Sequence, residues 1–294
     1  MEISDLMPIL GGVASRQTLV NVTSRRQLEQ ALRSGQLVRV NRGRYAVPAL
    51  HAGTELALKV TGHVCLASAA LAHGWKVKVV PERPQIAVPK HRRIDETTRS
   101  LMDLSWIDLE DRQTEGLATG AATTLEMCGR RLPFDEALSI ADSALRDGFP
   151  HQALLDLAGC ARGPGSAGLR RVAAHADGRS ANPFESVLRA LTYDVAGLDV
   201  EPQVSITGAL GLRVRPDLVD RRLGIALEAD SFEWHSDRAA LRRDARRYDL
   251  LVANGWVVLR FAWEVVMHHP DWVRSVLAAT VVRTERHTPP RAPA

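Results

Sequence analysis

The chain has few cysteines and no long apolar stretch, and each shortage excludes a class of protein. Its three cysteines, Cys65, Cys128 and Cys160, form no CxxC pair. Neither a disulfide framework nor a cysteine zinc site is therefore expected, and the thiols fit a reducing compartment. No run approaches the roughly 18 apolar residues of a membrane span. The N-terminus, MEISDLMPIL, is acidic and interrupted by Pro8, which is not typical of a signal peptide. The sequence predicts a cytoplasmic protein with no membrane partner.

Lysine is also scarce. The sequence has Lys59, Lys76, Lys78 and Lys90, and arginine supplies the remaining positive charge. The formal net charge of +4 permits a nucleic-acid partner without requiring one. The places where the arginines gather are therefore more informative than their number.

A winged helix-turn-helix domain is predicted for residues 1–50. Apolar residues at helical spacing open a first helix, and a short second helix follows at residues 15–20. Ser24 and Gln27 form a capping box for a third helix. The run LVRVNRGRYAV then predicts a β-hairpin around Asn41-Arg42-Gly43.

The arginines of this domain lie on the third helix, away from its apolar stripe, and on the hairpin. Arginine suits bidentate contacts to guanine edges and charge contacts to phosphate. The sequence therefore predicts a DNA-contacting surface, and the alternative is a small helical cap with a solvated basic face. The predicted DNA-contacting residues are Arg25, Arg26, Gln30, Arg33, Arg39, Arg42 and Arg44.

Carboxylates gather in strand-like runs towards the other end of the chain. The runs LRVRPDLVD and LGIALEAD flank Arg221-Arg222, which predicts an antiparallel hairpin. Side-chain alternation puts Glu228 and Asp230 on one face of the second strand, and Asp217 occupies the first. Acids packed this closely repel one another and raise each other's pKa. Oxygen ligands suit Mg²⁺ or Mn²⁺, so Asp217, Glu228 and Asp230 are the predicted metal ligands.

Further groups around these strands extend the predicted site. His235 follows the second strand and titrates in the range of a general acid or base. Arg243 and Arg247 lie on the next helix, where they either contact phosphate or form a solvated face paired with nearby acids. Glu185 falls in the first turn of the preceding helix, a place that the helix dipole alone would also explain. Together with the carboxylates, these groups predict metal-assisted phosphodiester hydrolysis.

Residues 11–48 resemble the N-terminal winged-helix domain of AbiEi-type antitoxins, which belong to type IV toxin–antitoxin and abortive-infection systems. The basic helix and the wing sequence Arg42-Gly43-Arg44-Tyr45 carry the resemblance. Residues 51–175 resemble the α+β segment that follows in those proteins. The resemblance implies a protein that binds and represses its own promoter, with an AbiEii-like nucleotidyltransferase toxin as partner.

Residues 180–282 resemble the PD-(D/E)xK endonuclease superfamily, and within it the Vsr-like branch. The resemblance implies that Asp217 binds metal, that His235 is the general acid or base, and that Glu185 holds the metal or its water. Two departures stand out: Asp230 replaces the superfamily's lysine, and Ser231 stands where the branch usually has glycine. The matching positions are Arg215, Asp217, Glu228, Asp230, His235, Asp244, Arg247, Leu251, Gly255 and Arg260.

The sequence thus predicts an α+β protein in which a winged helix-turn-helix domain (1–50) and a middle α+β domain (51–175) precede a restriction-endonuclease-like α/β domain (180–282). This last domain is expected to have a mixed central sheet, and residues 283–294 a disordered tail. The expected function is that of a DNA-binding, metal-dependent endonuclease linked to toxin–antitoxin or phage-defence systems. The alternative is a non-enzymatic antitoxin or autorepressor with an inactive nuclease fold. A homodimer is left open.

Overall fold

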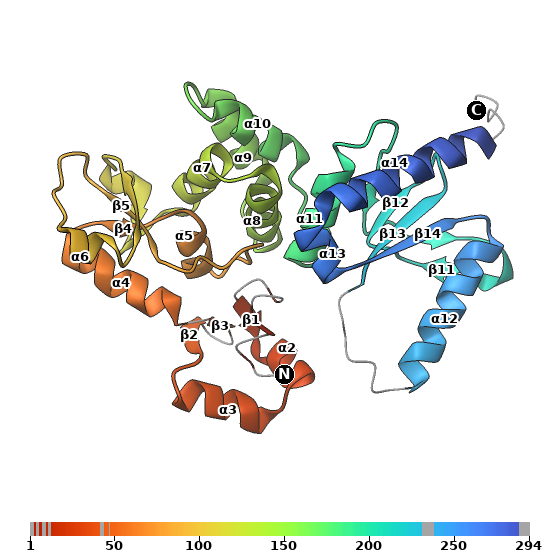
Figure 1. Cartoon of the computed structure of the whole chain (residues 1–294), viewed down its shortest axis with the longest axis horizontal. Helices are drawn as coiled ribbons and strands as arrows, with labels where there is room; N and C mark the ends of the chain where they lie inside the picture. Colours follow the sequence, from red (N-terminus) through yellow and green to blue (C-terminus); the bar gives the residue numbers. More distant parts are fainter. Residues whose placement is uncertain are drawn as a thin grey trace. The chain divides into compact units, whose positions relative to one another are not determined.

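The computed structural model of the protein describes residues 13–41, 44–46, 48–230 and 238–287, together with Ile3, Leu6, Met7 and Leu10. The chain forms two compact units, Met1–Pro183 (unit 1) and Phe184–Ala294 (unit 2). Each unit combines helices with strands, so the fold is α+β as predicted (Figure 1). No helix within the described ranges has both the length and the apolar character that a membrane crossing requires.

The N-terminal part of unit 1 packs helices against a small antiparallel sheet. Helices α2 (Arg16–Val22) and α3 (Arg25–Arg33) precede β2 (Val38–Asn41) and β3 (Arg44–Ala46), and β3 lies between β2 and β1 (Val13–Ser15). The Ser24 hydroxyl caps α3 by accepting a hydrogen bond from the Gln27 backbone N–H at 3.2 Å. Leu28 and Ala31 are buried beneath the helix. The predicted capped helix and the hairpin after it are confirmed.

The middle of unit 1 contains a sheet of short strands in the order β6-β5-β4-β8-β7. The alternating run KVKVV (residues 76–80) predicts a strand, and this prediction is wrong. The Lys76 backbone N–H donates to the Ser143 hydroxyl at 2.9 Å, and the Lys78 ammonium pairs with Asp135 at 2.6 Å. The segment is therefore tied to a helix instead of to a neighbouring strand. The elements are α4 (Ala49–Val60), β4 (His63–Val64), α5 (Leu66–Ala72), β5 (Gln85–Val88), α6 (Glu96–Arg99), β6 (Asp103–Trp106), β7 (Thr114–Glu115) and β8 (Ala118–Thr119).

Consecutive helices complete unit 1: α7 (Ala121–Arg131), α8 (Phe134–Arg146), α9 (His151–Cys160) and α10 (Ser166–His175). Helices α7 and α10 approach closely at Gly129, where an added Cβ would lie 2.7 Å from the Leu169 side chain. Glycine is needed there because any larger residue would push the two helices apart.

Unit 2 is built on a mixed sheet in the order β14-β13-β12-β9. Strand β12 (Leu218–Asp220) pairs antiparallel with β13 (Ile225–Asp230) and with the short edge strand β9 (Glu201–Pro202). Strand β13 pairs parallel with β14 (Val257–Ala262). The predicted hairpin and the predicted mixed sheet are confirmed. A separate antiparallel pair joins β10 (Ile206–Thr207) and β11 (Arg213–Val214).

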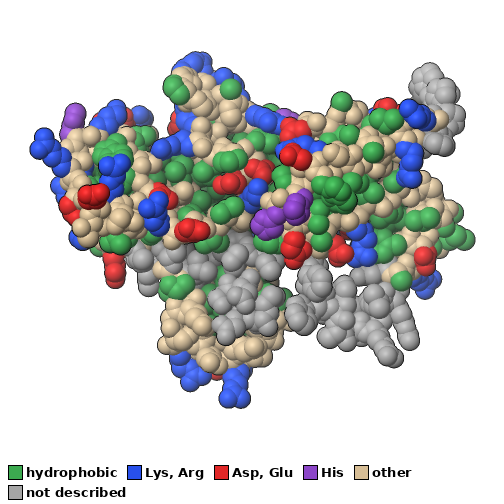
Figure 2. All heavy atoms as spheres, viewed as in Figure 1, with side chains coloured by type: hydrophobic (Ala, Val, Ile, Leu, Met, Phe, Trp, Pro, Cys, Tyr) green, Lys and Arg blue, Asp and Glu red, His purple; other side chains and the backbone are tan. Residues whose placement is uncertain are grey.

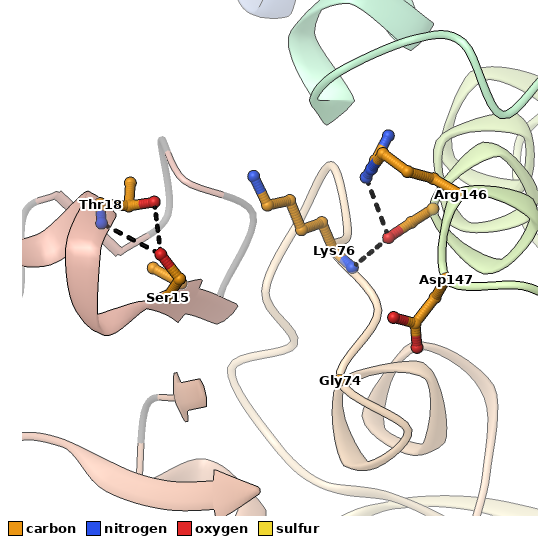
Figure 3. A pocket seen from close by; sticks show the side chains of 8 residues that line it. Ser15, Thr18, Gly74, Lys76, Arg146 and Asp147 are labelled. Atoms are coloured by element: carbon orange, nitrogen blue, oxygen red, sulfur yellow. Dashed lines mark hydrogen bonds between the residues drawn. The ribbon is translucent and has the colours of Figure 1, made fainter. Parts of the chain in front are cut away.

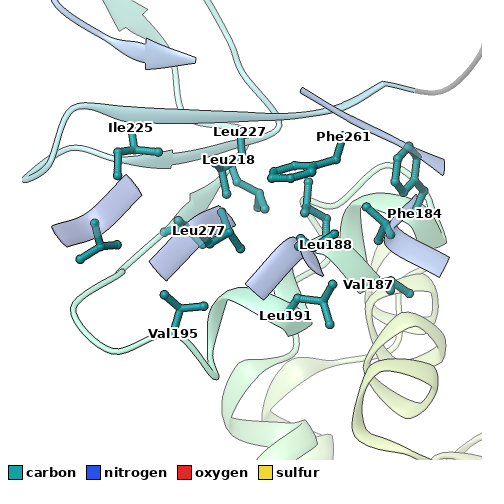
Figure 4. Close-up of a cluster of buried hydrophobic side chains, with 14 of the residues drawn as sticks. Phe184, Val187, Leu188, Leu191, Val195, Leu218, Ile225, Leu227, Phe261 and Leu277 are labelled. Atoms are coloured by element: carbon teal, nitrogen blue, oxygen red, sulfur yellow. The ribbon is translucent and has the colours of Figure 1, made fainter. Parts of the chain in front are cut away.

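One face of this sheet carries the larger hydrophobic core of unit 2 (Figure 4). Leu188 from α11 (Pro183–Thr192) and Leu277 from α14 (Pro270–His287) meet Leu218, Leu227 and Phe261 from the strands. Short helix α13 (Trp263–His268) adds Val266 to the same core. Helix α14 continues to His287, so residues 283–287 are helical and do not belong to the predicted tail.

Helix α12 (Arg238–Ala253) packs against the opposite face of the sheet. Its buried Leu251 meets Val219 of β12 and Val258 of β14 in a second, smaller core. The helix ends before Gly255, whose φ of +81° is the left-handed conformation that favours glycine after a helix. The side chains of β13 that face α12 therefore lie between the sheet and that helix.

Candidate functional site

Strand register places the predicted acids of unit 2 on the sheet face that α12 covers. Leu218 pairs with Leu227 and Val219 with Ala226, so Asp217, just before β12, comes opposite Glu228. Leu218 and Leu227 point into the larger core. Because neighbouring residues of a strand alternate between faces, Asp217 and Glu228 point the other way, towards α12.

The Asp217 carboxyl forms hydrogen bonds with several parts of the chain, the Glu228 side chain among them. Its Oδ2 accepts from the Ala229 backbone N–H at 2.9 Å, and its Oδ1 accepts from the side-chain amide of Gln203 at 3.1 Å. Burial raises the pKa of Asp217 above its usual range, although its hydrogen bonds and the charge of Arg247 act in the opposite direction. The folded chain thus fixes this carboxyl in place while disfavouring its charge.

Glu228 is the more deeply buried acid, with 5% of its surface exposed. Arg247 of α12 donates from Nη2 to Glu228 Oε1 at 2.5 Å. Burial nevertheless outweighs this attraction, and together with the nearby Asp217 it raises the pKa of Glu228 to about 8. Arg247 also donates to the backbone carbonyl of Arg215, which brings the loop before β12 to the same place.

Glu185 joins this cluster from the other side of the sheet. It lies in the first turn of α11 and is 5% exposed. The side-chain amide of Gln203 donates to Glu185 Oε2 at 3.0 Å and to Asp217 Oδ1 at 3.1 Å, so a single nitrogen joins the two carboxylates. A favourable helix dipole alone would leave a glutamate at the surface, and it does not explain this buried position.

Asp230 lies farther along β13 and has a different partner. Its carboxylate pairs with Arg260 of β14 at 2.8 Å, and about 40% of each side chain is exposed. The Arg260 guanidinium also lies 4.4 Å from the centre of the Tyr248 ring. Among the described residues, no hydrogen bond joins Asp230 to Asp217 or Glu228. The structure therefore brings Glu185, rather than Asp230, to the Asp217–Glu228 pair.

The donor set of this cluster, called the carboxylate cluster below (Glu185, Asp217 and Glu228), has the hard oxygens that Mg²⁺ and Mn²⁺ prefer. In the described part of the chain no group of three His, Cys, Asp or Glu side chains has the spacing to hold a metal ion. The Arg247 guanidinium lies against Glu228 Oε1, an oxygen that a cation would need. The carboxylate oxygens of the cluster are ligands that suit a divalent ion. In the present structure they accept hydrogen bonds from Gln203 and Arg247.

Several predicted site residues fall where the structure gives no side chain. His235 and Arg42 lie outside the described residues. Arg44 in β3 and Arg243 in α12 are described by their backbone alone.

The predicted DNA-contacting residues of α3 are exposed, and Lys and Arg side chains gather at the tip of the N-terminal part in Figure 2. Arg25 pairs with Glu29 at 3.1 Å, and the Arg33 side chain donates to the Glu29 backbone carbonyl at 3.3 Å. The acid Glu29 therefore lies within the predicted basic face. Arg26 and Gln30 are exposed beside it.

Gln203 was not singled out from the sequence, although it joins two of the predicted acids. It follows a two-residue strand, and its backbone adopts a φ of +56°, which amino acids other than glycine seldom do. No residue pattern in the run EPQVSIT indicates that turn. Tyr248, which packs against Arg260, was likewise not singled out.

A pocket elsewhere in the molecule has no acid pair of this kind. It lies in unit 1 and is lined by Ser15, Thr18, Gly74, Lys76, Ser143, Arg146 and Asp147, with Ala14 (Figure 3). The Ser143 hydroxyl accepts from the Lys76 backbone and from the Arg146 guanidinium. These hydrogen bonds connect residues of unit 1 to one another and indicate no chemistry on a ligand.

No family model matches the chain. Among solved structures, the chain is similar to the crystal structure of RV2827C protein from Mycobacterium tuberculosis, at 15% identity and a TM-score of 0.31, over 70% of this chain and 87% of that one. Two curated proteins of Mycobacterium tuberculosis, "Uncharacterized protein MT2308" and "Uncharacterized protein Rv2248", are each 30% identical over 275 residues, which cover 87% of this chain and 96% of theirs. The chain therefore belongs to the same protein family as Rv2248 and MT2308.

Proposed function

We propose that unit 2 is a divalent-metal-dependent nuclease and that unit 1 binds the DNA on which it acts. The observation that carries the proposal is the meeting of three largely buried acids: Glu185 and Asp217 share the Gln203 amide, and Glu228 lies opposite Asp217 and against Arg247 of α12. Burial raises the pKa of both Asp217 and Glu228. A fold gains nothing in stability from such a cluster, whereas a cation-binding site requires one.

The carboxylate cluster would hold Mg²⁺ or Mn²⁺, with Asp217 and Glu228 as the principal ligands. When bound, such an ion would polarise the phosphodiester and lower the pKa of a water molecule. By the resemblance to Vsr-like nucleases, His235 would carry the proton to or from the reacting oxygens. Asp230, paired with Arg260, would contribute at the edge of the site.

Arginines beside the cluster favour a polyanionic substrate. Arg247 contacts Glu228 and donates to the backbone carbonyl of Arg215 at 3.3 Å, which places the exposed Arg215 beside the cluster. Once a cation neutralises Glu228, the Arg247 guanidinium would be released for phosphate, to which it can bind in bidentate fashion.

The exposed face of α3 would supply the DNA affinity of unit 1. Arg26, Gln30 and Arg33 project from a helix whose other side is buried, and the hairpin β2–β3 follows directly. Exposed arginines on a rigid helix suit contacts to phosphates and guanine edges. We place this activity in the bacterial cytoplasm, in line with the free state of Cys65, Cys128 and Cys160.

A nicking assay tests the nuclease proposal. Purified protein is incubated with supercoiled plasmid and with single-stranded DNA, in Mg²⁺, in Mn²⁺ and in EDTA. We expect cleavage that needs the metal and that falls by about 100-fold or more in Asp217→Ala, because a ligand of the ion is lost. Asp199→Asn is the matched control, since Asp199 is an exposed acid of the same unit. Inert wild-type protein under all conditions, or equal cleavage by Asp217→Ala, contradicts the proposal.

A second candidate is a non-enzymatic antitoxin or autorepressor, with an AbiEii-like nucleotidyltransferase toxin as its partner. The pairing of Glu228 with Arg247 and of Asp230 with Arg260 favours it, because these acids already have cations within the chain. Repression of a reporter by the protein's own upstream region, retained in Asp217→Ala and lost in Arg26→Ala, would support this candidate. Metal-dependent cleavage would exclude it.

A further inference from the structure

We propose that Gln203 is the positioning residue of the carboxylate cluster, and that it holds Glu185 and Asp217 beside each other where the proposed cation would bind. The inference rests on the proposed function, since it concerns the same site. Three observations on Gln203 carry it: the hydrogen bonds of its side chain, the hydrogen bond of its backbone N–H, and its left-handed backbone conformation.

The side-chain amide of Gln203 reaches two acids that come from different elements. Its Nε2 lies 3.0 Å from Glu185 Oε2, on α11, and 3.1 Å from Asp217 Oδ1, before β12. An amide NH₂ group has two N–H donors and no charge. It can therefore hold two carboxylates towards one point without an ion pair that a cation would have to break.

The backbone of Gln203 is fixed to one of these acids as well. Its N–H donates to the Asp217 carbonyl at 2.8 Å, directly after β9 leaves the sheet. Main chain and side chain of Gln203 thus bind the same residue from two directions. The backbone hydrogen bond fixes the start of the side chain at the edge of the sheet, and the two carboxylates fix its amide end.

The φ of +56° at Gln203 disfavours any residue other than glycine. Residues kept in such conformations are found where a site requires them. Leu210 provides a comparison within the same unit: its φ is +58°, yet its side chain is 74% exposed. Glycine would suit the backbone at residue 203 better, but it would provide no amide.

Two substitutions separate the side chain from the backbone. Gln203→Gly removes the amide and suits the left-handed backbone, so the relief of backbone strain offsets part of the stability lost with the hydrogen bonds. Gln203→Ala removes the amide and keeps the strain. Leu210→Gly is the matched control, since it relieves a similar backbone conformation away from the cluster.

Mn²⁺ binding to the full chain, followed by calorimetry and by electron paramagnetic resonance, is the main measurement. We expect both Gln203→Gly and Gln203→Ala to bind Mn²⁺ about 10-fold or more weakly than wild type, with Leu210→Gly unchanged, because groups that orient metal ligands have effects of this size. Wild-type affinity in Gln203→Gly would overturn the inference.

The side-chain amide signals of Gln203 provide a second readout. They can be assigned in ¹⁵N spectra by their loss in Gln203→Ala, and we expect them to shift on addition of Mg²⁺. Signals that do not move while Mg²⁺ binds would overturn the inference and leave the nuclease proposal intact. Wild-type protein with no Asp217-dependent Mn²⁺ binding would overturn both.

Discussion

The charged face of α3 and the carboxylate cluster of unit 2 differ in how their charges meet water. On α3, the ion pair of Arg25 and Glu29 has side chains that are 75% and 50% exposed. In unit 2, the Glu228 side chain is 7% exposed and its partner Arg247 28%. Solvated charges contribute little to the fold and remain available to a ligand. Buried charges are bound to the fold, so any change at the cluster should alter stability as well as function.

The largest loss of stability from a single substitution is expected for Arg247→Ala, which removes the guanidinium beside Glu228. A buried acid that loses its cation destabilises a fold, and we expect a loss of about 3 kcal/mol in the free energy of unfolding near pH 9. The loss should be smaller near pH 5, where Glu228 is protonated. Urea unfolding at both pH values provides the measurement. The neighbouring exposed Arg246→Ala is the control, and an equal loss in both variants would contradict the prediction.

The second prediction concerns Glu228, which should make the free energy of unfolding depend on pH. Its pKa is raised from 4.5 to about 8 in the folded protein, so the folded state binds the proton more tightly than the unfolded state does. The stabilisation is complete below pH 4.5 and is lost as pH rises through about 8.

Glu228→Gln cannot titrate at this position. Its stability should therefore fall less than that of wild type as pH rises, by on the order of 4 kcal/mol between about pH 5 and about pH 9. Thermal unfolding across that range measures the difference. Parallel curves for the two proteins would show that Glu228 titrates normally.

A smaller loss is expected at the N-terminal end of α3. Ser24→Ala removes the hydroxyl that accepts from the Gln27 N–H, and such caps contribute about 1 kcal/mol. Ser34→Ala, at the other end of the same helix, removes a hydroxyl that bonds only the Ala31 carbonyl and should have less effect. Chemical unfolding followed by circular dichroism distinguishes the two, and equal losses would argue against the cap.

Arg26→Ala should change stability least and DNA binding clearly. Arg26 is exposed, so its removal should leave the melting temperature unchanged. If Arg26 contacts a phosphate, the slope of log K against log salt should become shallower by about 1. Fluorescence anisotropy with labelled DNA at several salt concentrations measures this. Unaltered affinity and slope would remove Arg26 from the DNA-contacting surface.

The features that follow from local patterns could be predicted from the sequence. Two-residue alternation placed Glu228 on the face opposite Leu227, and the short turn at Arg221-Arg222 brought Asp217 next to it. The cap at Ser24 could also be predicted, because capping depends on residues within one turn of a helix. In each case the deciding contact lies within a few residues or across one hairpin.

Contacts between elements that lie far apart in the sequence could not be predicted. The parallel pairing of β13 and β14 puts Arg260 beside the acids of β13, and nothing in either strand sets that register. Asp230 shares a strand face with Glu228 as expected, but its ion-pair partner, Arg260, could not be foreseen. The alternating run at residues 76–80 suggested a strand, yet Ser143 and Asp135 provide its polar partners. Gln203 joins the acids only because a left-handed turn follows β9.

Strand β9 also limits how copies of this chain can associate. Pro202 lies in that edge strand and has no N–H to offer a neighbouring strand, and β9 spans two residues. Edges of this kind resist sheet-to-sheet joining between molecules. Strand β14, at the other edge of the same sheet, spans six residues. A second copy or an added peptide that extends this sheet would therefore be expected along β14, away from the turn that holds Gln203.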